Sequence, residues 1–130
     1  MAGLAQKDMK DCSEDIAKAT GIMFMSRTYA HMAHLKTRSY VTHKALDEFY
    51  NEIIDLADEF IEAGQGQYGI LDIPFVNISG NVNDPIGALQ GHLKQLEQTV
   101  ACIDEEYLQI IFQEIQKLYR STLYKLINLS

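Results

Sequence analysis

The chain of 130 residues has no tryptophan, only two prolines and only two cysteines. Pro74 and Pro85 lie close together, so the long stretches on either side of them are free to be helical. Cys12 and Cys102 fit no metal-binding or disulfide spacing, and we expect both to be thiols in a reducing compartment. No apolar run reaches the about 18 residues of a membrane span, and the first residues lack the apolar centre of a signal peptide. A cytoplasmic protein is therefore expected.

Basic residues are also scarce. Eleven Lys and Arg against 18 Asp and Glu give a net charge of −7, which argues against a general nucleic-acid binder and suits cations or basic partners. Near the N-terminus Lys7 and Lys10 are cancelled by Asp8 and Asp11, so we expect no strong DNA binding. Apolar residues make up 47% of the chain, enough for one folded domain spanning residues 1–130.

Apolar residues recur at helical spacing in four segments, most clearly between Val41 and Ala63. The expected helices span about 12–36, 41–63, 85–102 and 104–127. Gly64 and Gly66 are expected to end the second helix. Asp84 before Pro85 is typical of a helix start. Asp104 is expected to cap the fourth helix.

The connection between the second and third helices is long. Gln65–Gly69 has the composition of a turn, and Ile70–Ile78 is β-branched and extended in character. A connection of this length is expected when it must cross the length of a helical bundle. The sequence therefore predicts an all-α fold, a ferritin-like four-helix bundle with a long crossover connection between its second and third helices.

Four polar residues share one stripe of the second expected helix. At 100° per residue, the stripe is about 100° wide and lies between the apolar and solvated faces. It contains His43, Asp47, Asp58 and Glu62. Imidazole and carboxylate on neighbouring turns are ligands for iron or manganese in helical bundles. Acidic residues at such a seam are more often simply solvated, so the spacing alone leaves both interpretations open.

The first expected helix adds two histidines, His31 and His34, one turn apart and just before the turn that leads to His43. A histidine on an apolar face is more often a hydrogen-bonded core residue than a ligand. His34 lies at the centre of the inward stripe of this helix, whereas His31 lies about 60° away. His92, on the third helix, has no acidic neighbours and is interpreted as a surface or core histidine.

The five positions His31, His43, Asp47, Asp58 and Glu62 resemble the ferroxidase signature of the Dps-type miniferritins, the DNA-binding proteins from starved cells. The segments His43–Tyr50 and Ile54–Glu62 are similar to the family's second helix. The resemblance covers about residues 12–63, and beyond them only the order of the helices. It implies an iron site at a two-fold interface, with three ligands from one chain and Asp58 and Glu62 from the other.

The resemblance further implies that ferrous iron is oxidised at this site, with peroxide as the preferred oxidant, and stored in a hollow twelve-subunit shell. The family has tryptophan after its first histidine, whereas this chain has Met32. His34-Leu35 is therefore a second candidate for that His-Trp pair, and the choice between His31 and His34 stays open. The family's connection also contains a short helix, which the segment around Pro74 does not suggest.

A second resemblance is to ferritin-like proteins of tailed bacteriophages, carried by His34–Tyr40 and Gln65–Gly69. Two functions are thus expected as alternatives. The first is an iron-binding, iron-oxidising miniferritin. The second is a non-enzymatic oligomer, encoded by a phage, that binds a host protein or a small ligand through surface loops such as Gly64–Gly69. Because the first two helices are too apolar for one bundle to cover, either function predicts a homo-oligomer built on two-fold dimers.

Overall fold

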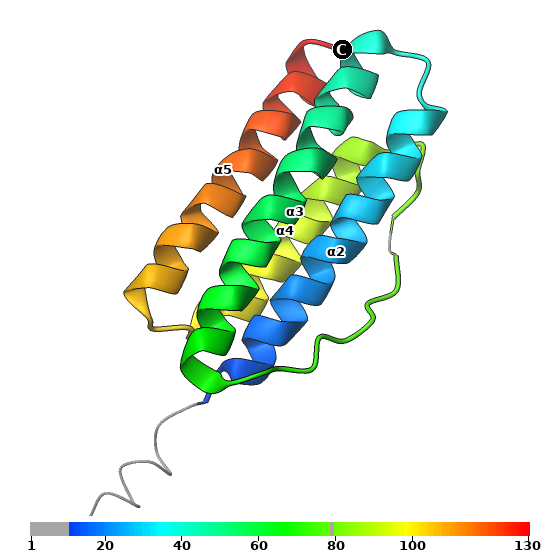
Figure 1. The fold of residues 1–130 in the computed structure, drawn as a ribbon. Helices are drawn as coiled ribbons and strands as arrows, with labels where there is room; N and C mark the ends of the chain where they lie inside the picture. The colour runs from blue at the N-terminus through cyan, green and yellow to red at the C-terminus, as the bar shows by residue number, and fades with distance from the viewer. Residues whose placement is uncertain (1–10, 79) are drawn as a thin grey trace, which may run out of the picture.

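The computed structural model describes residues 11–78 and 80–130, and in this part of the chain it is all-α (Figure 1). Four long helices lie side by side and carry the core, which confirms the all-α class. A short 3-10 helix precedes the last of them. The elements are α2 (Ser13–Lys36), α3 (Tyr40–Tyr68), α4 (Pro85–Thr99), η1 (Val100–Cys102) and α5 (Glu106–Asn128).

The helices are held together by one apolar core. α2 contacts α3 and α4, and α5 contacts the same two helices from the other side of the bundle. The largest fully buried side chains come from all four helices and include Tyr29, Phe49, Leu89 and Tyr119. His92 is also buried, and its Nδ1 lies 3.0 Å from the hydroxyl of Ser26, so it is a core histidine.

The connection between α3 and α4 runs along α2 (Figure 1). A Cβ added to Gly21 on α2 would lie only 2.6 Å from the carbonyl oxygen of Pro74. Ile73 and Val76 are half-buried against the core, whereas Phe75 between them is fully exposed. The connection therefore covers part of the apolar surface of α2 within the same chain. The homo-oligomer expected from the apolar first two helices stays a prediction.

The end of α3 differs from expectation. The helix does not end at Gly64 and Gly66 but continues to Tyr68, and Gly69 (φ +85°) follows it as C-cap. Gly64 is buried, and a Cβ there would lie 2.7 Å from Cγ2 of Ile16. This glycine thus permits close contact with α2 instead of ending a helix. The turn expected at Gln65–Gly69, and the recognition loop expected at Gly64–Gly69, are wrong.

Helix starts were predicted with mixed success. Asp84 accepts a backbone N–H from the first turn of α4, and Pro85 begins the helix, as expected. Asp104 does not cap α5, whose N-cap is Glu105. The third expected helix, about residues 85–102, is divided in the structure. Its α-helical part α4 ends at Thr99, and the 3-10 helix η1 follows from Val100 to Cys102. Within the described residues no helix is long and apolar enough to cross a membrane. Lys7 and Lys10, on which the expectation of no strong DNA binding rests, lie outside the residues that the structure describes.

Candidate metal site

Two histidines are joined across the turn between α2 and α3. Nδ1 of His34 lies 2.7 Å from the carbonyl oxygen of His43, and Nδ1 of His43 lies 2.8 Å from the carbonyl oxygen of His34. Because a carbonyl can only accept, each ring donates its Nδ1–H, and in the neutral ring Nε2 keeps its lone pair. The two rings stack with centroids 3.7 Å apart. A hydrogen bond from Nδ1–H to a carbonyl is the usual support of a histidine that binds metal through Nε2.

The same contacts explain why the chain turns here. The last carbonyls of a helix have no partner within it, and the His43 ring satisfies one of them, that of His34. At the start of α3, the hydroxyl of Ser39 accepts the N–H of Thr42 at 3.2 Å. The turn is therefore fixed from both helices, and the histidines belong to its structure.

His31 lies on the outer side of this pair. Its ring stacks on Tyr50 with centroids 4.3 Å apart and the planes only 14° from parallel. A hydrogen bond to the Asp47 carboxylate raises the pKa of Tyr50 above its usual range. His31, Asp47 and Tyr50 are half-buried, whereas His34 is only 7% exposed. The outer group could therefore meet a ligand from solvent more easily than His34.

Asp58 and Glu62 lie elsewhere on α3, and both are exposed. With a rise of 1.5 Å per residue, Asp58 lies about 22 Å along the helix from His43 and about 16 Å from Asp47. No three of the six expected ligands in the described chain bring their donor atoms within 4.8 Å of one another. Within one chain, the expected ligands therefore form two separate groups. One group lies near the turn between α2 and α3, and the other is the acidic pair Asp58 and Glu62 further along α3.

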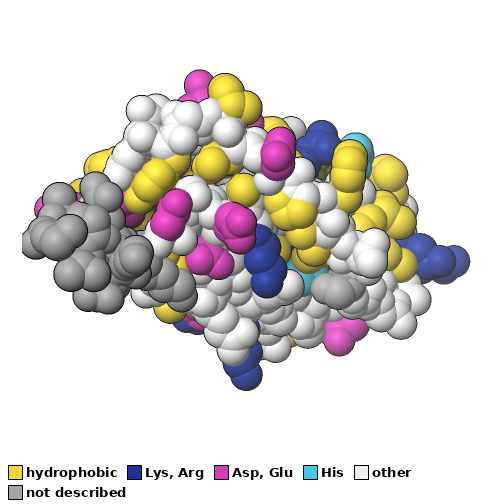
Figure 2. All heavy atoms as spheres, turned by 90° about the horizontal axis from the view of Figure 1, so that it is seen from below, with side chains coloured by type: hydrophobic (Ala, Val, Ile, Leu, Met, Phe, Trp, Pro, Cys, Tyr) yellow, Lys and Arg dark blue, Asp and Glu magenta, His cyan; other side chains and the backbone are white. Residues whose placement is uncertain are grey.

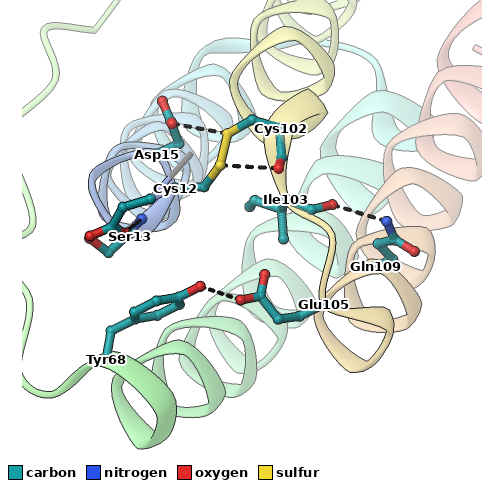
Figure 3. Close-up of a disulfide and its surroundings, with 9 residues drawn as sticks. Cys12, Ser13, Asp15, Tyr68, Cys102, Ile103, Glu105 and Gln109 are labelled. Carbon is teal, nitrogen blue, oxygen red and sulfur yellow. Dashed lines mark hydrogen bonds between the residues drawn. A yellow bond between two sulfur atoms is a disulfide. The ribbon is translucent and has the colours of Figure 1, made fainter. Parts of the chain in front are cut away.

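A group of three other side chains was not predicted from the sequence. Cys12 and Cys102 form a disulfide with Cα atoms 6.2 Å apart, so the expectation of two thiols is wrong for this structure. The residues are 90 positions apart and meet because η1 ends beside the first turn of α2 (Figure 3). Sγ of Cys102 also lies 3.1 Å from Oδ2 of Asp15. No spacing in the sequence indicates this contact, which depends on the packing of the bundle.

The comparisons place the chain among related sequences. Residues 34–126 match the model of a family described as "Family of unknown function (DUF5856)". A stretch of 49 residues is 41% identical to the "Uncharacterized 14.6 kDa protein in mobD-ri intergenic region" of Enterobacteria phage T4, and covers 38% of each chain. This chain therefore aligns with well under half the length of that relative. No solved structure matches the chain. Since the family model matches most of its residues, the chain belongs to the family of unknown function DUF5856.

Proposed function

We propose that the protein is a ferritin-like, iron-binding protein that oxidises ferrous iron at a site shared between two copies of α3. Four long helices and a connection that runs along α2 support this proposal, because ferritin-like bundles combine four helices with one long crossover connection. The acidic chain favours ferrous ions as substrate, since its negative potential attracts cations.

The symmetry of one surface row on α3 carries the proposal. The row has positions 43, 47, 51, 54, 58 and 62, and every position is half-buried or exposed. His43 and Glu62 are equally distant from the midpoint between Glu52 and Ile53, and so are Asp47 and Asp58. If a two-fold axis passes through that midpoint, the antiparallel copy of α3 places Glu62 opposite His43 and Asp58 opposite Asp47. Ligands that one chain keeps apart would then meet.

The geometry at the turn suggests a role for each histidine. His43 keeps Nε2 as an electron-pair donor because Nδ1–H is held by a carbonyl. His31 and Asp47 are half-buried, and both are linked to Tyr50, His31 by stacking and Asp47 by a hydrogen bond, so we assign them to the same half of the site as His43. His34 has the same hydrogen-bond pattern but is buried, so we assign it to the support of the turn.

Electrostatics adds a condition to the assembly. Two-fold pairing sets the Asp47 carboxylate against that of Asp58, and like charges at short distance repel. A cation between them removes the repulsion, as in other carboxylate-rich metal sites. We therefore expect the α3 pairing to strengthen with ferrous iron. Each ferrous ion loses one electron, and peroxide or dioxygen as co-substrate takes up the electrons and protons to give water. Storage in a larger shell is the further step that the family resemblance implies.

The test removes the acidic half of the site. The double change Asp58→Ala with Glu62→Ala should abolish rapid ferrous oxidation, measured by the absorbance of ferric products. Both residues are exposed, so the folded state should lose little stability. Asp55→Ala with Glu59→Ala is the matched control, because it removes the same charges from exposed positions of α3 outside the row. Equal oxidation rates in the first variant and the wild type would contradict the proposal.

A second candidate is a non-enzymatic protein that binds a host protein. The fully exposed Phe75 and the largely exposed Ile70 on the connection favour it, because large apolar side chains in solvent often mark interaction sites. Hydrophobic side chains also reach the surface over much of the face seen in Figure 2, between acidic and basic ones. This candidate predicts that ferrous iron does not change the mass of the protein in solution. It also predicts that the protein does not accelerate the oxidation of ferrous iron.

A further inference from the structure

A second group of metal-binding side chains lies at the end of the bundle where α2 begins. Cys12 immediately precedes α2, Asp15 is in its first turn, and Cys102 ends η1 (Figure 3). The two Sγ atoms and a carboxylate oxygen of Asp15 all lie within 4.8 Å of one another. Within the described part of the chain, this is the one group of three such residues that meets this distance.

We propose that reduction of the disulfide turns this group into a binding site for one Zn²⁺ ion, held by the thiolates of Cys12 and Cys102 and the carboxylate of Asp15. The reductant is a small-molecule thiol: two of its molecules give two electrons and two protons to the Cys12–Cys102 disulfide and are themselves joined as a disulfide. Two sulfurs and one oxygen are ligands that zinc accepts in tetrahedral sites, with water in the fourth position. Each thiol gives its proton to solvent when the metal binds. Thiolates favour zinc over the harder ferrous ion that we assign to the row on α3.

The surrounding structure should keep the three ligands close after reduction. Ile16, one turn after Cys12, is fully buried, and Ile103, next to Cys102, is also buried. The N–H of Ile103 donates to the carbonyl of Val100 at 2.9 Å, and Gln109 donates to the carbonyl of Ile103 at 2.9 Å. These contacts do not involve the sulfur atoms. The two hydrogen bonds fix Ile103 to η1 and α5, and the burial of Ile16 and Ile103 in one apolar core is what we expect to keep η1 beside α2 after reduction.

The charge of the site suits its position. Two thiolates and a carboxylate carry three negative charges, so the complex with Zn²⁺ keeps one negative charge. The N-terminus of α2 carries a partial positive charge, which stabilises both an anionic complex and the Cys12 thiolate. Disulfide and zinc use the same sulfur atoms and therefore exclude each other, and either one would tie α2 to η1.

The test uses Co²⁺ as a spectroscopic probe for the zinc site in the full chain, reduced and freed of metal. We expect thiolate-to-cobalt absorption in the near ultraviolet that saturates at one ion per chain and disappears when Zn²⁺ is added. The disulfide form should give no such band. The variant Cys102→Ser should lose it, with its folding checked by circular dichroism.

Asp15→Asn tests the third ligand without removing a sulfur. It should keep the thiolate band but bind Co²⁺ about tenfold more weakly or worse. The double variant Asp58→Ala with Glu62→Ala is the control and should bind Co²⁺ at the cysteines like the wild type, which separates this site from the proposed iron site. Absence of the band in the reduced wild type, or an unchanged affinity in Asp15→Asn, would overturn the proposal.

Discussion

His34 and His43 each donate a ring N–H to the other's backbone carbonyl, and their rings stack face to face. The exchange joins the last turn of α2 to the first turn of α3. It also fixes the tautomer of both rings, because a carbonyl accepts only from a protonated nitrogen. One arrangement thus stabilises the turn and leaves the lone pair on Nε2 of His43, the atom that we propose as a metal ligand.

Single substitutions should separate the two roles. His34→Ala should lower the free energy of unfolding by about 2 kcal/mol, because it removes a buried ring and its hydrogen bond. His31→Ala removes a stacking contact with Tyr50 at the surface and should cost about 1 kcal/mol or less. Thermal unfolding and anaerobic titration with ferrous iron measure both effects. Weaker iron binding is expected mainly in His31→Ala, and the reverse pattern would identify His34 as the ligand.

Two glycines of α3 offer a matched pair for the packing of the helix. Gly64→Ala places a methyl group 2.7 Å from the buried Ile16, and we expect a loss of about 1–3 kcal/mol. Gly66→Ala meets no atom within 4 Å, so the gain in helix propensity should stabilise the protein by about 0.5–1 kcal/mol. Denaturant unfolding of both variants tests this expectation. If both gain stability, the close contact between α2 and α3 is not present in solution.

The contact between Tyr68 and Glu105 makes stability depend on pH in both directions. The Tyr68 hydroxyl donates to the Glu105 carboxylate, which lowers the pKa of Glu105 and raises the pKa of Tyr68 to about 12. The contribution from Glu105 is present above its ordinary pKa and is lost as pH falls through the lowered value. The contribution from Tyr68 is complete below pH 10.0 and is lost as pH rises toward about 12.

Tyr68→Phe should remove the part of both effects that comes from this contact, and it should cost about 1 kcal/mol at neutral pH. Its melting temperature should therefore fall less than that of the wild type in acid, and less above pH 10.0. Tyr124→Phe is the control, since this exposed tyrosine lies far along α5 from Glu105. Parallel pH profiles for wild type and Tyr68→Phe would show that this contact does not contribute to the pH dependence.

The sequence predicted features that depend on neighbouring residues. The start of α4 at Asp84 and Pro85 follows from local capping chemistry, and the structure has it. The side-chain row on α3 follows from helical periodicity. Gly64 was misassigned because its role comes from Ile16, which is distant in the sequence. Sequence rules that treat glycine as a helix end carry no information about such a contact.

The Cys12–Cys102 pair could not be predicted for the same reason. Two cysteines 90 residues apart match no spacing motif, and they meet only after α2 and η1 have packed together. The proposed iron site on the surface row of α3 is also hard to predict from one sequence. Periodicity shows that His43 and Glu62 share a stripe, but the distance along the helix means that they can meet only through a second chain. The sequence of one chain gives the residues of such a site but not the pairing of two chains that would bring them together.

Mixing two inactive variants tests the shared site most directly. Asp47→Asn impairs one half of the proposed site, and Asp58→Ala with Glu62→Ala removes the other. Each variant alone should oxidise ferrous iron slowly. In a two-fold pair made of one copy of each, one of the two sites has all its ligands, so random pairing should restore about a quarter of the wild-type rate. A mixture that is no faster than the two variants measured separately would contradict a site shared between two chains.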